Sequence, residues 1–87
     1  MSAEDTQKAI RSAYEYLVGA LVATGVKPEN TSNFRVEEAE MNDKGNFRIT
    51  LSYEVVGQFA FEREKELKDF EIQPDGKVLW MKIRPKA

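Results

Sequence analysis

Carboxylates are the only plentiful reactive side chains in this sequence of 87 residues. It contains no histidine and no cysteine, so the usual general base, the thiol nucleophile and the common transition-metal ligands are missing. It also has no glycine-rich phosphate loop, no calcium-binding loop and no Gly-x-Ser-x-Gly motif. We therefore predict that the protein is not an enzyme, and we name no catalytic residue, no metal ligand and no cofactor.

Four glutamates are the candidates for acid–base chemistry. Glu37, Glu38, Glu40 and Glu54 could pair across neighbouring strands, as the two carboxylates of a glycosidase do. On a half-buried antiparallel sheet, however, glutamates that alternate with apolar residues form the solvated face. We expect that role for these four. The alternative is a small-ligand-binding domain or a carboxylate-based enzyme with a pocket between helix and sheet.

Aromatic residues that the core does not need give a better functional lead. Phe59 and Phe61 lie near Val56 in a connection where a polar turn would serve, and Trp80 faces outward in one register of the last hairpin. Together they predict an exposed apolar patch of the kind that binds a protein or peptide. In the alternative, Phe59 and Phe61 fold back over the open end of the core and Trp80 is covered. The predicted function is a non-catalytic interaction module, and homodimerisation is its simplest form.

The charge pattern argues against a nucleic-acid partner. The formal net charge is -2, and basic and acidic residues are interspersed along the chain, so no basic stripe is available to neutralise a phosphate backbone. The longest apolar stretch, residues 17–23, is far shorter than the ~20 residues of a membrane span, and it has neither the position nor the flanks of a signal sequence. We expect no membrane partner and a cytoplasmic location.

A long amphipathic helix is predicted from about Ala3 to Thr24. Glu4 and Asp5 place negative charge in its first turn, and Gly25 ends it. Gly19 lies inside this helix, where we expect it to permit close approach to a sheet. Charged residues four apart predict two exposed ion pairs, Glu4 with Lys8 and Arg11 with Glu15.

Residues 47–55 form the clearest strand, because apolar and polar residues alternate along them without exception. The preceding segment, residues 42–45, predicts a type I turn with Gly45 in the left-handed conformation. That turn places Met41 opposite Phe47 and Ala39 opposite Ile49. The apolar residues before Glu37 and those after Glu38 stand at alternating positions of opposite parity. Both sets can face inward only if the strand has a bulge there.

The turn of the last hairpin decides which residues of segment 78–83 face inward. A two-residue loop, Asp75-Gly76, pairs Phe70 with Met81 and leaves Trp80 outside. A three-residue loop that adds Pro74 pairs Phe70 with Trp80 instead. We favour the first register, because it gives three consecutive inward positions: Leu79, Met81 and Ile83.

These elements predict a single α+β domain spanning residues 1–87, in which one N-terminal helix packs on a four-stranded antiparallel β-meander in two layers. On this basis Leu51→Ala should destabilise the fold by ~2 to 5 kcal/mol, whereas Thr50→Ala should matter little. The predicted inward-facing set is Ile10, Tyr14, Leu17, Val18, Leu21, Met41, Phe47, Ile49, Leu51, Tyr53, Phe70, Ile72, Leu79, Met81 and Ile83.

The order of elements, with a closing hairpin that reads Phe70-Glu-Ile-Gln-Pro-Asp-Gly-Lys-Val-Leu79, resembles PepSY domains and, more loosely, cystatin-like folds. The likeness covers about residues 5 to 84. In PepSY domains the closing hairpin similarly carries an Asp-x-x-Gly-x-Val signature, and the family is associated with restraining peptidases. The resemblance therefore implies a non-catalytic binding module.

Overall fold

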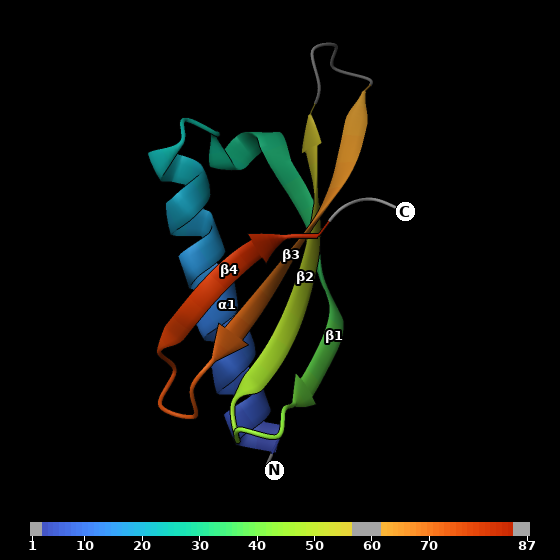
Figure 1. Cartoon of the computed structure of the whole chain (residues 1–87). Helices are drawn as coiled ribbons and strands as arrows, with labels where there is room; N and C mark the ends of the chain where they lie inside the picture. Colours follow the sequence, from blue (N-terminus) through green and yellow to red (C-terminus); the bar gives the residue numbers. More distant parts are fainter. Residues whose placement is uncertain (1–2, 57–61, 85–87) are drawn as a thin grey trace.

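The computed structural model describes residues 3–56 and 62–84 of the chain. One helix packs on one face of a four-stranded antiparallel sheet with the strand order β1-β2-β3-β4, and the other face of the sheet carries no helix among these residues (Figure 1). The predicted α+β meander is thus confirmed. The elements are α1 (Ala3–Ala23), the short 3-10 helix η1 (Pro28–Asn30), β1 (Thr31–Met41), β2 (Phe47–Val56), β3 (Arg63–Ile72) and β4 (Val78–Ile83).

Helix α1 ends where the sequence predicts. Gly25 has a φ of 90°, its N–H donates to the carbonyl of Val22 at 3.1 Å, and the N–H of Val26 donates to the carbonyl of Leu21 at 2.9 Å. These two bonds are those of a Schellman motif, which requires the left-handed residue. Gly19, by contrast, does not permit close approach to the sheet: it is exposed, and a Cβ added to it would meet nothing within 4 Å.

The β1–β2 hairpin has the predicted register. Met41 pairs with Phe47 and Ala39 with Ile49, around a turn in which the N–H of Gly45 (φ 80°) donates to the carbonyl of Asn42 at 3.1 Å. The expected bulge lies between Val36 and Glu38. A second irregularity, between Ser32 and Arg35, was not predicted; it contains Asn33, whose φ of 55° is in the left-handed region.

The last hairpin combines the two registers that the sequence allows. Ile72 pairs with Val78, as the three-residue loop requires, but Phe70 pairs with Met81, as the two-residue loop requires. A register shift next to Ile72 reconciles them. Leu79 is the extra residue of β4 at this shift and is 41% exposed, so the prediction that it faces inward is wrong.

The core lies between α1 and the two central strands. A helix is about 10 to 12 Å wide, whereas four strands spaced about 4.8 Å apart are wider, so one helix leaves the outer strands partly uncovered. For this reason three more side chains predicted to face inward are exposed: Tyr14 (43%), Met41 (43%) and Ile83 (70%). The buried apolar set is Ala9, Ala13, Leu17, Phe47, Ile49, Leu51, Tyr53, Phe70 and Ile72, and Ile10, Leu21 and Met81 pack against it.

Candidate functional site

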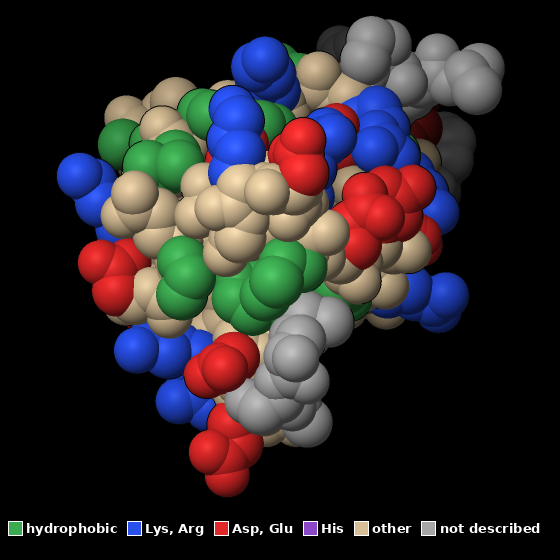
Figure 2. Space-filling model, turned by 60° about the horizontal axis from the view of Figure 1, so that its bottom comes forward, with side chains coloured by type: hydrophobic (Ala, Val, Ile, Leu, Met, Phe, Trp, Pro, Cys, Tyr) green, Lys and Arg blue, Asp and Glu red, His purple; other side chains and the backbone are tan. Residues whose placement is uncertain are grey.

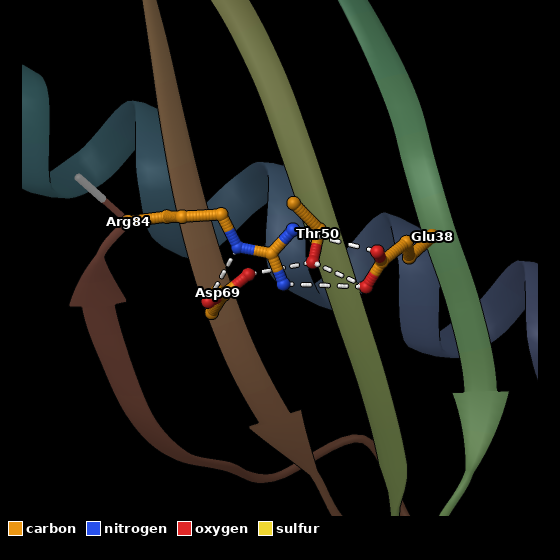
Figure 3. Close-up of polar contacts among 4 residues, drawn as sticks. All are labelled: Glu38, Thr50, Asp69 and Arg84. Atoms are coloured by element: carbon orange, nitrogen blue, oxygen red, sulfur yellow. Dashed lines mark hydrogen bonds and ion pairs between the residues drawn. The ribbon is translucent and has the colours of Figure 1, made fainter. Parts of the chain in front are cut away.

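A polar cluster spans the open face of the sheet (Figure 3). Arg84, which directly follows β4, donates from Nε to Asp69 Oδ2 at 3.1 Å and from Nη2 to Glu38 Oε2 at 3.3 Å. Thr50, on the strand between these acids, donates from Oγ1 to Asp69 Oδ1 at 2.6 Å. The hydrogen bonds with Glu38 and then Asp69 raise the pKa of the Arg84 guanidinium. This cluster joins β1 to β3 across β2 and pairs one guanidinium with two carboxylates.

Two further glutamates named as acid–base candidates also have partners of their own. Glu37 forms an ion pair with Lys65 at 3.7 Å, and Glu54 accepts a hydrogen bond from Asn33 Nδ2 at 2.9 Å. Glu40 is exposed and lies opposite Arg48 in the strand register. Each of these carboxylates faces a cation or an amide rather than a second free carboxylate.

Glu71 lies at the end of the open face near the hairpin turns. Only 8% of this residue is exposed, and its Oε2 accepts a hydrogen bond from Asn46 Nδ2 at 2.8 Å. The pKa of Glu71 is lowered, chiefly by the hydrogen bond from Asn46 and then by one from Asn42, against a smaller opposing effect of burial. The carboxylate is therefore held in its ionised form.

The residues predicted to form an interaction surface are not brought together where they are described. Val56 is half-buried at the end of β2, opposite Arg63, and Trp80 is half-buried in β4, opposite Glu71, with Lys82 Nζ 4.8 Å from its ring centroid. Along β3 these two pairings are eight positions apart, which corresponds to roughly 26 Å. Phe59 and Phe61 lie outside the described residues, so the surface they were predicted to form stays a prediction.

A different apolar surface lies between α1 and β1, and we call it the α1–β1 groove. It consists of two hollows that meet at Tyr14 and Phe34, whose rings are in edge contact with centroids 5.1 Å apart. Phe34 stacks in turn on the buried ring of Tyr53 at 5.4 Å, which fixes the floor of the groove to the core.

The two hollows differ in charge. The first, of about 400 Å³, is open to solvent and is lined by Ile10, Val36 and Leu51 together with Arg11 and Arg35. The second, of about 290 Å³, includes Val18, Leu21, Val22 and Val26, and none of the described residues that line it is charged. The groove is therefore apolar along its length, with Arg11 of α1 beside the first hollow.

The two arginines of the first hollow are free of ion pairs and hydrogen bonds with the rest of the described chain. The predicted pairs of Arg11 with Glu15 and of Glu4 with Lys8 are not formed. Arg11 is on α1, whereas Arg35 is on β1, where it pairs with Ser52 and so has the parity of the sheet face away from α1. Arg35 also lines a hollow on that face together with Glu54 and Lys65.

Sequence reasoning missed this groove because it assigned several of the residues that line it, such as Tyr14 and Leu21, to the core and gave Val22 no role. The signal was present: the apolar stripe of α1 continues sideways to Val22, and Val36 in β1 has the inward parity. What could not be read from the sequence was the width of the sheet relative to one helix. On the face that Figure 2 shows, which includes the end with the two hairpin turns, hydrophobic side chains lie among charges of both signs.

Within residues 3–56 and 62–84, no group of acidic side chains is arranged to hold a metal ion. No helix in this part of the chain combines the length and the apolar character needed to cross a membrane. Comparison of the sequence with protein-family models and with curated proteins, and of the fold with solved structures, finds no match in any of the three.

Proposed function

We propose that this protein is a non-catalytic interaction module that binds a protein or peptide segment in the α1–β1 groove. One observation carries the proposal: large apolar side chains on both walls of the groove are exposed, with Tyr14 at 43%, Val22 at 53% and Val36 at 44%. Exposed apolar side chains along one groove are typical of a surface that a partner covers. A segment seated there would remove these side chains from water.

Strand addition at the outer edge of β1 is a weaker mode of binding. The two irregularities, at Val36/Glu38 and at Ser32/Arg35, interrupt the ladder of free backbone groups that an added strand needs. Glu37 and Glu38 also flank this edge and are engaged with Lys65 and Arg84. Insertion of side chains into the groove does not depend on a regular edge.

The arrangement of the carboxylates supports a role without catalysis. Arg84 ties Glu38 and Asp69 to each other, and Glu71 is kept ionised by amide donors. General acid catalysis by a carboxyl group needs a raised pKa and access to a substrate. Of the glutamates that the sequence offered for this chemistry, Glu37, Glu38 and Glu54 are bound to Lys65, Arg84 and Asn33.

A small apolar ligand is the second candidate, since the first hollow, at about 400 Å³, has the size of a ligand site. Such sites normally bury roughly 70 to 90% of the surface of the ligand. An open groove between one helix and an edge strand covers a smaller share of that surface. A peptide segment satisfies an open groove better, because it can lie along both hollows.

The resemblance to PepSY and cystatin-like domains fits a binding module and remains part of the proposal. We also propose that the module works in the cytoplasm with a protein partner and without nucleic acid or membrane. The alternation of charge sign along the chain supports the exclusion of nucleic acid.

Selection of peptides from a random library tests the proposal. Peptides of about twelve residues, long enough to span both hollows, are selected on the intact chain, and their affinities are measured by fluorescence polarisation. We expect Val22→Asp/Val36→Asp to weaken the selected peptides at least about tenfold. Ile83→Asp, at a residue that is 70% exposed on β4, is the matched control and should leave the affinities unchanged. Failure to select any peptide, or equal binding to the groove variant, would contradict the proposed function.

A further inference from the structure

We propose that β4 pairs edge to edge with β4 of a second copy of this chain, so that two four-stranded sheets join into one across a two-fold axis. In the strand order β1-β2-β3-β4, this edge lies opposite the α1–β1 groove. The inference therefore goes beyond the proposed function and does not depend on it. It rests on the backbone groups of β4, on its exposed apolar side chains and on the pairing that a two-fold axis allows.

The outer edge of β4 offers unpaired backbone groups. The N–H of Arg84 donates to the carbonyl of Leu67 at 3.0 Å, and these two residues continue the β3–β4 register. In an antiparallel ladder, every second residue directs its N–H and C=O groups to the same neighbouring strand. Lys82 therefore bonds to β3, whereas Met81 and Ile83 direct their N–H and C=O groups away from it. Among the described residues, no strand lies beyond this edge.

The side chains of this edge are mostly apolar. Met81 lies opposite the core residue Phe70, so it is directed to the α1 side of the sheet, and Ile83 has the same parity. Ile83 is 70% exposed and Leu79 is 41% exposed. Lys82 is the one charged residue of β4. An edge strand with exposed apolar side chains and little charge is a template for pairing with another chain.

The other edge of the sheet is less suited to pairing. β1 has two irregularities and carries three glutamates, whereas β4 pairs with β3 without interruption from Trp80 to Ile83. Each copy therefore has one regular free edge. A two-fold contact uses this edge on both copies and is closed, because a third copy would have to pair with the interrupted edge of β1. The expected assembly is a dimer.

A two-fold axis also restricts the register, because residues directly opposite each other direct their side chains to the same face. An axis at Met81 places Leu79 opposite Ile83 of the second copy, which joins the two most exposed apolar side chains of β4. It also places Trp80 opposite Lys82 of the second copy, a cation and a ring that already lie 4.8 Å apart within one chain. An axis at Lys82 would set two like charges against each other, and an axis at Trp80 would leave Ile83 opposite the turn.

Sedimentation velocity of the intact chain tests the pairing over roughly 1 µM to 1 mM, the range expected for a small interface. We expect a reversible dimer. Ile83→Asp places a carboxylate against Leu79 of the second copy and should raise the dissociation constant of the dimer at least about tenfold. Ile83→Pro should weaken the dimer as well, because it removes an outward N–H and no hydrogen bond to β3. Val22→Asp/Val36→Asp, at exposed valines of the groove, is the matched control and should leave the dimer unchanged.

Single cysteines test the register, because the chain contains none of its own. Met81→Cys should form a disulfide-linked dimer on mild oxidation, since hydrogen-bonded residues opposite each other have Cα atoms about 5.5 Å apart, within the range of a disulfide. Lys44→Cys, in an exposed turn, is the control and should stay uncrosslinked. A crosslink through Lys82→Cys or Trp80→Cys but not through Met81→Cys would overturn the register.

The outcomes separate this inference from the proposed function. A wild type that is monomeric over the whole range, or a dimer that Ile83→Asp and Ile83→Pro leave intact, overturns the pairing of β4. A dimer that Val22→Asp/Val36→Asp dissociates overturns it too, because the second copy would then occupy the groove. A dimer that depends on Phe59 and Phe61 instead has the same consequence. Failure to select a peptide that binds the groove contradicts the proposed function alone.

Discussion

Glu71 couples the stability of this fold to pH. Its pKa is lowered below the ordinary value of 4.5 because Asn46 and Asn42 donate hydrogen bonds to the ionised carboxylate. The folded state therefore holds a proton on this group less readily than the unfolded state does. The resulting stabilisation is fully present above the unfolded pKa and is lost as the pH falls through the lowered, folded pKa.

Asn46→Ala should reduce this acid sensitivity, because it removes the largest cause of the lowered pKa. We expect the variant to be less stable than the wild type near neutral pH and the difference to shrink as the solution is brought to about pH 3. Urea unfolding followed by circular dichroism at both pH values measures it. Asn30→Ala, at an exposed position, is the control, and a difference for Asn46→Ala that does not change with pH would contradict the assignment.

Gly19 is a site where one methyl group should stabilise the protein. It lies in the interior of α1, it is exposed, and a Cβ there meets nothing within 4 Å. Gly19→Ala should therefore raise the free energy of unfolding by about 0.5 to 1 kcal/mol through helix propensity. Gly25→Ala, at a φ of 90°, should lower it instead. A thermal melt of both variants tests the pair, and an unchanged or lower midpoint for Gly19→Ala would show that this glycine has a role the fold does not reveal.

At the scale of elements, β2 is buried on both faces, which changes one expectation from the sequence. Leu51 is 3% exposed beneath α1, and Leu51→Ala should still cost about 2 to 5 kcal/mol. Thr50 is also only 3% exposed, on the opposite face, and it donates a hydrogen bond to Asp69. Thr50→Ala should thus cost about 1 to 2 kcal/mol rather than little.

The exposed neighbour Arg48 provides the reference for this comparison, since Arg48→Ala should stay within about 0.5 kcal/mol of the wild type. Urea titrations of the three variants rank them. If Thr50→Ala and Arg48→Ala had equal midpoints, the polar cluster with Asp69 and Arg84 would contribute nothing to stability.

The elements were predictable where a local rule decided them. The end of α1 follows from Gly25, and the β1–β2 register follows from the turn at residues 42–45 and from unbroken alternation in β2. The register of β4 was not predictable, because two loop lengths were compatible with the sequence and a bulge at Leu79 satisfied parts of both. The burial of Thr50 depends on long side chains from β1, β3 and the end of β4, which meet only in the folded chain.

At the scale of the whole molecule, the candidate site was the hardest feature to predict. The apolar residues of the groove look like core residues in the sequence, and only the folded shape shows that one helix leaves β1 partly uncovered. The surface predicted instead is divided: Val56 and Trp80 lie near opposite ends of the sheet, and the polar cluster of Thr50, Asp69 and Arg84 lies between them. The pattern of apolar residues shows which face of a helix or strand is directed inward. It does not show whether one helix is wide enough to cover that face of the whole sheet.

Self-association through Phe59 and Phe61 is a prediction for the intact chain. If these residues bind a second copy, the wild type should sediment as a dimer, because two apolar patches then cover each other, and Phe59→Asp/Phe61→Asp should sediment as a monomer. Sedimentation velocity over a range of concentrations measures both. A wild type that stays monomeric throughout would contradict the homodimer and leave the groove as the surface that needs a partner.

The position of Trp80 decides what optical spectroscopy can follow in this protein. It is the sole tryptophan of the chain, it is half-buried on the face away from α1, and it lies between Lys82 and the pairing partner Glu71. Its intrinsic emission should therefore report detachment of β4 and the ionisation of its carboxylate neighbour. Ligands that occupy the space between α1 and β1 should leave that emission almost unchanged, so titrations of that region need a dye or a resonance assigned to Tyr14.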